Sequence, residues 1–353
     1  MSDGVISSNV RYSFIIPIYN RPDELNELLE SILHQSIIDF EVIVVEDGST
    51  ITCQDVCQTY SCHFKLHYYE KPNSGPGPSR NYGVERAIGD YVIILDSDVV
   101  LPPDYLKNVD TFITSHSDIS LFGGPDRAAD TFTPVQKAIS YSMTSFFTTG
   151  GIRGGKKKLD KFFPRSFNMI VLRKTFIEVS GFIPMRFGED IDFSYRVCEN
   201  GYKTSLIPDA WVWHKRRTDF DKFFRQVYNS GRARIDLSQR HPGTLRLVHL
   251  LPTLFTLGVT TLVVLALIFR LLNNAWWMWC LIPLVLYCIL IFIHSSRQNH
   301  SMQIGILSVE AAFIQLFGYG IGFISALFCK PSSQNSSINS EQNGVEFNKK
   351  FYG

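Results

Sequence analysis

Three groups of polar residues each follow an apolar run in the first hundred residues of the chain. The runs cover residues 12–18, 40–47 and 91–98, and their ends carry Tyr19-Asn20-Arg21, Glu46-Asp47-Gly48-Ser49 and Asp96-Ser97-Asp98. Two carboxylates separated by one residue are hard oxygen ligands, which can hold Mg²⁺ or Mn²⁺ together with substrate phosphates. Many Asp-x-Asp pairs are solvated turns, so the position of this pair directly after an apolar run is what makes it a candidate site.

The elements around these groups alternate between strand-like and helix-like patterns. Continuous apolar runs such as 12–18 are typical of buried parallel strands, and leucines at helical spacing follow Pro22. We also expect strands at 65–70 and 167–173, and helices at 79–89 and 187–201. This alternation predicts an α/β fold with a mostly parallel sheet flanked by helices. The carboxyl ends of parallel strands meet at one edge of the sheet, so the three polar groups should converge there.

The C-terminal part of the chain has a different composition. Apolar stretches cover residues 247–269, 275–293 and 304–329, and a membrane-spanning helix needs about 20 residues. The first two stretches carry no formal charge, whereas the third contains Glu310 and Gln315. We therefore predict a membrane region with two to three helices over 247–329. The N-terminus shows no basic stretch followed by an apolar one, which predicts that no signal peptide is cleaved.

A basic segment precedes the first apolar stretch. Between Trp211 and Arg246 the chain has nine Lys and Arg residues against three Asp residues. Such an excess beside a span predicts a multi-pass protein of the cell membrane with its catalytic part on the cytoplasmic side. The formal net charge of the whole chain is only +1, which argues against a nucleic-acid binder.

The basic segment also contains apolar residues at helical spacing, namely Phe220, Phe223, Phe224, Val227 and Tyr228. This pattern predicts an amphipathic helix. Two positions for it stay open: a helix in the lipid headgroup layer, or a helix packed on the soluble domain by the same stripe. The Gly- and Lys-rich residues 150–165 read as a mobile loop, either a lid over the site or a plain solvated connection.

Several ordered motifs together resemble glycosyltransferase family 2, whose members have the GT-A fold. They are SFIIPIYNRPDEL, EVIVVEDGST, GPGPSRNYGVERAIGDYVIILDSD, FGEDIDFSYRV and WVWHK. The resemblance runs from Tyr12 to His214. It implies an inverting transfer of a sugar from a nucleoside diphosphate to a hydroxyl group, assisted by a divalent metal ion. The domains it suggests are a nucleotide-sugar-binding catalytic domain at 10–215, the basic interfacial segment at 216–246, the membrane region at 247–329 and a disordered tail at 330–353.

The resemblance implies a role for residues around the reacting atoms. Asp190 matches the general base, beside Glu189 on the substrate side. Asp98 matches the carboxylate that binds Mn²⁺ or Mg²⁺, and His214 a further metal or phosphate ligand. Asp96 would contact the ribose, or the metal through water. The plainer alternatives are that Asp190 only compensates a helix dipole and that His214 is structural.

The resemblance also implies residues that bind the donor nucleotide. Asp47 matches the carboxylate that receives the uracil N–H, and Pro17 and Tyr19 match the residues that bracket the base. Arg80 matches a residue near the ribose and diphosphate, although it could be a plain surface charge. Glu46 stands where many members have Asp, which makes the preference for a nucleobase less certain.

The function expected from this resemblance is the transfer of one sugar from a nucleotide sugar, with UDP as the expected nucleotide. The predicted membrane region and interfacial helix favour an acceptor at the membrane, a lipid-linked saccharide. The Gln-x-x-Arg-Trp motif of processive synthases is missing from the nearest stretch, residues 226–232, which favours a single addition. One alternative is direct transfer to a polyprenyl phosphate, as in dolichyl-phosphate-sugar synthases. Another is a non-catalytic, membrane-bound subunit that binds nucleotide sugars.

Overall fold

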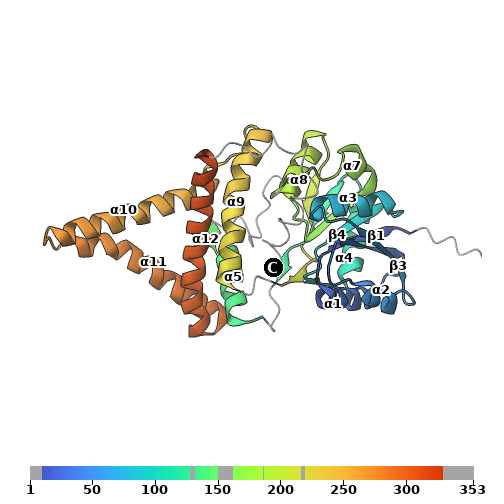
Figure 1. The fold of residues 1–353 in the computed structure, drawn as a ribbon, viewed down its shortest axis with the longest axis horizontal. Helices are drawn as coiled ribbons and strands as arrows, with labels where there is room; N and C mark the ends of the chain where they lie inside the picture. The colour runs from blue at the N-terminus through green and yellow to red at the C-terminus, as the bar shows by residue number, and fades with distance from the viewer. Residues whose placement is uncertain (1–9, 128–131, 150–161, 186, 216–218, 329–353) are drawn as a thin grey trace, which may run out of the picture. The chain divides into compact units, whose positions relative to one another are not determined.

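The computed structural model describes residues 10–127, 132–149, 162–185, 187–215 and 219–328. These residues form two compact units (Figure 1). The first contains the described residues up to 127 and those from 162 to 214, and the second contains the described residues from 132 to 149 and from 215 to 328. Residues 150–161 of the predicted lid and the predicted tail lie outside the described residues.

The first unit is built on a seven-stranded sheet with the order β3-β2-β1-β4-β8-β6-β9. β1 to β4 are parallel to one another, and β8 is antiparallel to both β4 and β6. The predicted mostly parallel sheet is therefore confirmed. The strands are β1 (Tyr12–Ile18), β2 (Phe40–Asp47), β3 (Lys65–Lys71), β4 (Tyr91–Leu95), β6 (Leu121–Gly123), β8 (Asn168–Leu172) and β9 (Thr204–Leu206).

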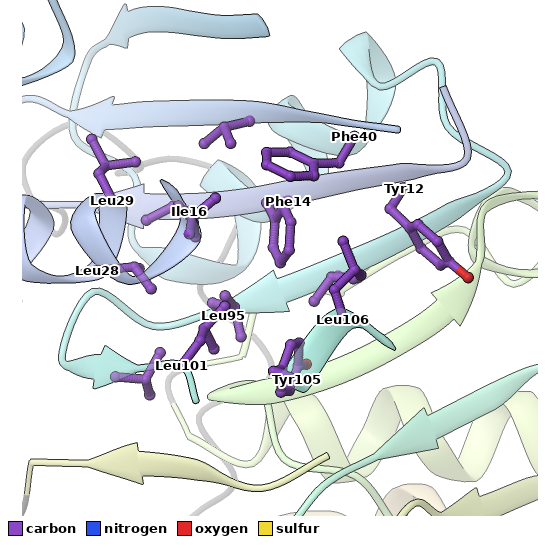
Figure 2. Packing of buried hydrophobic residues seen from close by; sticks show 14 of the residues in the cluster. Tyr12, Phe14, Ile16, Leu28, Leu29, Phe40, Leu95, Leu101, Tyr105 and Leu106 are labelled. Atoms are coloured by element: carbon purple, nitrogen blue, oxygen red, sulfur yellow. The ribbon is translucent and has the colours of Figure 1, made fainter. Parts of the chain in front are cut away.

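Helices cover both faces of this sheet. One face carries α1 (Pro22–Leu33), α2 (Gln54–Tyr60) and α4 (Tyr105–Ser115), and the other carries α3 (Pro76–Arg86), α7 (Arg173–Glu178) and α8 (Glu189–Glu199). β1 shows why its apolar run is continuous: Phe14 and Ile16 enter the core under α1 (Figure 2), whereas Ile15 enters the core under α3. Burying one such side chain contributes about 1.5–3 kcal/mol, which holds the strand between its two helix layers.

The bounds of α3 differ from the predicted helix at 79–89. The helix begins three residues earlier than predicted, at Pro76, so it includes Gly77 and Pro78. Proline suits the first helical position, where its fixed φ is already helical and its missing N–H has no partner to lose. The helix ends at Arg86 because Ala87 is extended.

The second unit consists of helices. They are α5 (Pro134–Thr144), α6 (Phe146–Thr149), α9 (Phe220–Arg240), the 3₁₀ turn η1 (Leu247–His249), α10 (Leu251–Leu271), α11 (Trp276–Asn299) and α12 (Met302–Phe328). By length and composition, α10, α11 and α12 could each cross a membrane. α12 is the most buried of the three because it packs against the other helices of its unit.

The predicted amphipathic helix is α9, and its apolar stripe packs on α12 and α5. Phe223 and Val227 are buried in a cluster with residues of those two helices. The backbones of α9 and α12 approach closely: a Cβ added at Gly322 would lie 2.0 Å from the carbonyl oxygen of Tyr228. Such close helix packing requires small residues. The stripe therefore packs inside the second unit, an arrangement that neither alternative had foreseen.

Candidate active site

The carboxyl ends of β1 and β4 form the topological switch point of the sheet. β1 pairs with β4 only as far as Ile15, opposite Ile94, whereas its pairing with β2 continues to Ile18, opposite Glu46. β2 and β3 follow on one side of β1 and β4 lies on its other side, so the strand order reverses at β1. Open α/β sheets bind ligands at the carboxyl end of the strands where this reversal occurs. Pro17 and Tyr19 are half-buried at this end of β1.

Asn20 joins the end of β1 to the turn after β2. Its Oδ1 accepts hydrogen bonds from the backbone N–H groups of Thr50 and Ile51, at 2.8 and 3.0 Å, and its own N–H donates to Ser49 Oγ. Asn20 has φ 53°, a left-handed conformation that asparagine tolerates better than most residues. This side chain therefore positions the polar turn 46–49 beside the switch point.

Asp47 is buried at the end of β2, and both its carboxylate oxygens accept hydrogen bonds. Oδ1 accepts from Lys71 Nζ at 2.5 Å and from the N–H of Ser74, and Oδ2 accepts from the N–H of Gly75 at 2.8 Å. The side chain thus holds the segment that leads into α3. Its predicted contact with a uracil ring stays a prediction.

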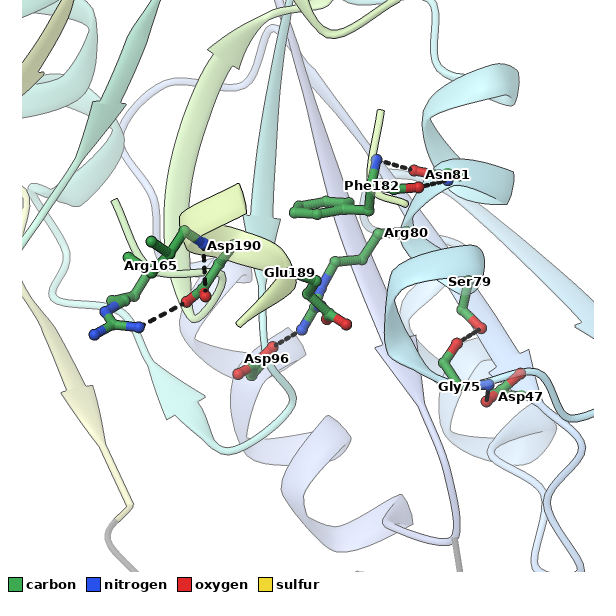
Figure 3. A network of polar contacts seen from close by, with 11 residues as sticks. Asp47, Gly75, Ser79, Arg80, Asn81, Asp96, Arg165, Phe182, Glu189 and Asp190 are labelled. Carbon is green, nitrogen blue, oxygen red and sulfur yellow. Dashed lines mark hydrogen bonds and ion pairs between the residues drawn. The ribbon is translucent and has the colours of Figure 1, made fainter. Parts of the chain in front are cut away.

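Arg80 links the Asp-x-Asp pair to the predicted base region (Figure 3). It projects from α3, and its guanidinium donates to Asp96 Oδ1 at 2.7 Å and to a carboxylate oxygen of Glu189. Its side chain is only 4% exposed, which excludes the plain surface charge. One arginine therefore fixes the start of α8 relative to the end of β4.

Replacing Arg80 with Ala is expected to destabilise the protein by about 3–5 kcal/mol, because Glu189 would remain buried without its partner. The measurement is denaturant unfolding of the detergent-solubilised protein at about pH 8, where Glu189 is mostly ionised. The matched control is Lys203→Ala, which breaks an exposed ion pair with Asp118 and should leave the midpoint unchanged. Equal midpoints for both variants would contradict the role assigned to Arg80.

Glu189 occupies an unfavourable place for a negative charge. Burial raises its pKa to about 7, the neighbouring carboxylates of Asp190 and Asp96 raise the pKa as well, and Arg80 lowers it. An unfolded Glu titrates near 4.5. Between these two values the folded protein holds a proton at Glu189 that the unfolded chain has released, so the folded state loses stability as the pH rises from about 4.5 through about 7.

We expect Glu189→Gln to remove the part of the loss of folding stability with rising pH that is due to Glu189. The amide stays neutral at every pH, so the unfolding midpoint of the variant should rise relative to that of the unaltered protein as the pH increases from about 5 to about 8. Denaturant midpoints of both proteins, measured across this range, test the expectation. Parallel curves would show that Glu189 titrates at its ordinary pKa.

Asp190 is the second residue of α8, directly after Glu189. Its Oδ1 accepts from the backbone N–H of Ile191 at 2.8 Å, and its Oδ2 lies 3.4 Å from Arg165 Nη1. Gly188, whose φ of 83° turns the chain into the helix, directly precedes Glu189. The carboxylate oxygen on the Arg165 side therefore carries only one long contact among the described residues.

Asp96, Asp98 and His214 form a group that could hold a metal ion. One ligand atom from each lies within 4.8 Å of the others. A second, three-stranded sheet brings them together: β5 (Val99–Val100) pairs with β10 (Val212–His214), which pairs with β7 (Asp126–Arg127). His214 Nε2 lies 3.3 Å from Asp98 Oδ1. Two carboxylates and one imidazole fit Mn²⁺ well, since this ion accepts oxygen ligands and tolerates nitrogen.

Three residues that the sequence analysis did not single out complete this site. Asp126 Oδ2 lies 3.9 Å from His214 Nδ1, and the ring of Phe167 stacks on His214 with centroids 4.6 Å apart. Arg165 contacts Asp190, as described above. Asp126 and Phe167 come from distant segments with no motif of their own, so their sequence carries no signal of these contacts.

Contacts join several of the predicted site residues within the first unit. Lys71 Nζ, bound to Asp47, also lies 3.2 Å from the hydroxyl of Ser79, which precedes Arg80 in α3. Arg80 then reaches Asp96 and Glu189. Arg80 therefore connects Asp96 to Glu189 (Figure 3), whereas Asp47 is joined to α3 through Lys71 and Ser79.

Comparison with known proteins identifies the family of this region. Residues 13–181 match the sequence model of Glycosyl transferase family 2. Poly(ribitol-phosphate) beta-N-acetylglucosaminyltransferase TarS of Staphylococcus aureus is 34% identical over 117 residues, which cover 32% of this chain and 20% of TarS. The putative teichuronic acid biosynthesis glycosyltransferase TuaG of Bacillus subtilis is 36% identical over 129 residues, which cover 36% of this chain and 51% of TuaG. The matched parts therefore span from about a fifth to about half of these relatives.

Solved structures share the fold. The mannosyltransferase PcManGT of Pyrobaculum calidifontis, in complex with GDP-Man and Mn²⁺, aligns with a TM-score of 0.61 over 86% of this chain and 87% of its own, at 16% identity. A structure of TarS residues 1–349 with UDP-GlcNAc aligns with a TM-score of 0.50 over 86% of this chain and 92% of its own, at 19% identity. The family model thus confirms the predicted family for residues 13–181, which belong to glycosyltransferase family 2, and the likeness to these structures confirms the predicted GT-A fold.

Proposed function

We propose that this protein transfers one sugar from a nucleoside-diphosphate sugar to an acceptor hydroxyl, with inversion at the anomeric carbon. The observation that carries the proposal is the bridge of Arg80 between Asp96, beside the candidate metal group, and Glu189, beside Asp190. A displacement of this kind needs a leaving diphosphate and a proton acceptor on opposite sides of one carbon. The bridge holds groups suited to both tasks in one region.

In the proposed reaction the acceptor oxygen attacks the anomeric carbon from the side opposite the diphosphate. A bond forms between that oxygen and the carbon, the bond from the carbon to the diphosphate oxygen breaks with its electron pair, and the hydroxyl proton passes to Asp190 Oδ2. The products are the glycosylated acceptor and a nucleoside diphosphate. A divalent ion held by Asp96, Asp98 and His214 would offset the negative charge of the diphosphate.

We propose a UDP-sugar as the donor, with Pro17, Tyr19 and Asp47 at the nucleobase end. The family relative TarS has been solved with UDP-GlcNAc, which supports this choice. Asp47 is already engaged by Lys71 and two backbone N–H groups, so a uracil ring would share this carboxylate with them.

We propose an acceptor at a membrane surface, a lipid-linked saccharide, with the catalytic region on the cytoplasmic side of the cell membrane. Three helices long and apolar enough to cross a bilayer support membrane attachment. The excess of Lys and Arg just before α10 supports the cytoplasmic orientation. TarS is a poly(ribitol-phosphate) glycosyltransferase and TuaG a putative glycosyltransferase of teichuronic acid biosynthesis, and these relatives support an acceptor that belongs to the biosynthesis of a polymer.

The experiment has two stages. The detergent-solubilised protein is first screened against a panel of nucleotide sugars with Mn²⁺ for release of nucleoside diphosphate, which identifies the donor. The donor is then offered with detergent-dispersed lipid-linked saccharides and with matched water-soluble sugars. Preferential transfer to the lipid-linked acceptor is expected, and equal use of the soluble sugars would refute the membrane acceptor.

The chemical nature of the transfer product also distinguishes the proposed function from its two alternatives. An acid-labile phosphodiester would show direct transfer to a polyprenyl phosphate rather than to a sugar hydroxyl. Tight binding of nucleotide sugars with no turnover on any acceptor would show a non-catalytic subunit. A glycosidic bond that is stable to mild acid is the result that the proposal predicts.

A further inference from the structure

Arg165 lies next to Asp190, the candidate general base, and the residues just before Arg165 are packed against the rest of the first unit. Phe162 and Pro164 pack against the backbone of Gly123. The contact is so close that a Cβ added at Gly123 would lie 2.9 Å from Pro164 Cβ. The ring of Phe163 meets Tyr195 of α8 edge-on, with centroids 4.8 Å apart. These contacts fix the backbone from which the Arg165 side chain extends, so its place beside Asp190 is set by packing and not by the ion pair alone.

The guanidinium of Arg165 has unused capacity. Its only side-chain contact among the described residues is Asp190 Oδ2 at 3.4 Å, and the side chain is 37% exposed. Arg80 and Arg196, by contrast, are mostly buried and each bind two or more oxygens. A guanidinium offers five N–H donors in a planar fork, and most of those of Arg165 have no partner among the residues that the structure describes.

Arg165 also lies on the side of the base from which an acceptor would approach. Figure 3 shows Arg165 and Arg80 on opposite sides of the Glu189-Asp190 pair, with Asp96 near Arg80. Asp190 Oδ1 accepts a hydrogen bond from the Ile191 N–H at 2.8 Å, whereas Oδ2 has only the 3.4 Å contact with Arg165, so Oδ2 is the better placed oxygen to take a proton. A hydroxyl that reaches Oδ2 therefore arrives beside the guanidinium.

We infer that Arg165 selects acceptors that carry an oxyanion, a phosphate or a carboxylate, next to the reacting hydroxyl. The inference rests on the proposed function and deepens it. A planar guanidinium matches both anions in a two-bond geometry, and binding them would draw Arg165 away from Asp190 Oδ2. A neutral sugar would leave the charge of Arg165 paired only with the carboxylate that must accept the proton.

The test compares acceptors that differ only in charge. The probes carry the same alkyl chain and are dispersed in detergent: dodecyl ribitol 5-phosphate against dodecyl ribitol, and dodecyl glucuronide against dodecyl glucoside, each with the donor found in the screen above. The unaltered protein is expected to prefer an anionic member by on the order of 10- to 100-fold in kcat/KM, the range of a charge-assisted hydrogen bond. Arg165→Ala should reduce this preference to about twofold or less, and Arg165→Lys should retain part of it.

Two further measurements test whether the loss of acceptor preference is specific to Arg165. The donor KM should be unchanged in Arg165→Ala, because the residue lies on the acceptor side. Lys174→Ala, which removes an exposed charge on α7, should keep the full preference. Thermal stabilisation by the donor shows that each variant is folded.

Three outcomes would overturn the inference. The first is a preference that survives in Arg165→Ala. The second is a raised donor KM with unchanged acceptor preference, which would assign Arg165 to the donor diphosphate. The third is equal use of neutral and anionic probes by the unaltered protein. Failure of the unaltered protein to transfer sugar from any donor would instead overturn the proposed function, and the inference with it.

Discussion

Replacing Asp190 with Asn should lower kcat by about 100- to 10,000-fold, the contribution of a positioned general base. The amide keeps the shape of the side chain and its contact with the Ile191 N–H, but its oxygen cannot take the proton of the acceptor. Donor binding should persist, because Asp190 lies beside, not within, the group that would hold the diphosphate. The measurements are single-turnover product formation and the donor dissociation constant.

The control for this variant is Asp104→Asn, which changes an exposed carboxylate in the same unit and should leave turnover unchanged. Normal turnover by Asp190→Asn would remove the assignment of the base. A loss of donor binding equal to the loss of turnover would instead show that Asp190 holds the donor. The family match ends at residue 181, before this residue, so the assignment depends on the experiment.

Removing divalent ions with a chelator should stop turnover, and Mn²⁺ should restore it. Neutralising a leaving diphosphate is worth several kcal/mol, so we expect a loss of about 100-fold or more. The residues present fit this role: two carboxylates and one imidazole are the candidate ligands, and the Asp126 carboxylate beside His214 adds negative charge that favours a cation.

The variants Asp98→Asn and His214→Ala should each raise the Mn²⁺ concentration needed for half-maximal activity at least about 10-fold. Mn²⁺ binding to the protein alone, followed by electron paramagnetic resonance, should weaken in parallel. Phe167→Leu, which removes only the ring stacked on His214, should have a smaller effect. Activity that is unaffected by the chelator would refute the metal-binding roles of all three candidate ligands.

Much of the fold could be predicted because its local patterns are unambiguous. β1, β2 and β4 are buried on both faces, so their apolar runs are continuous and end where the polar groups begin. The same feature places Asp47, Asp96 and Asp98 at strand ends, and the order of the strands then brings them to one edge of the sheet. The apolar lengths of α10, α11 and α12 were equally clear from composition.

The partners of the individual side chains were decided only by the tertiary structure. Arg80 was predicted to lie near a diphosphate, yet its guanidinium is bound by Asp96 and Glu189, which come from segments 16 and 109 residues away. Asp126 and Arg165 reach the site through β7 and through a packed segment without a motif. The apolar stripe of α9 has the same sequence pattern whether it faces lipid or protein. The small residues of α12 allow the close approach by which α9 packs on α12. Periodicity reports which face of an element is apolar, whereas the choice of partner depends on contacts between residues far apart in the chain, and these exist only once the chain has folded.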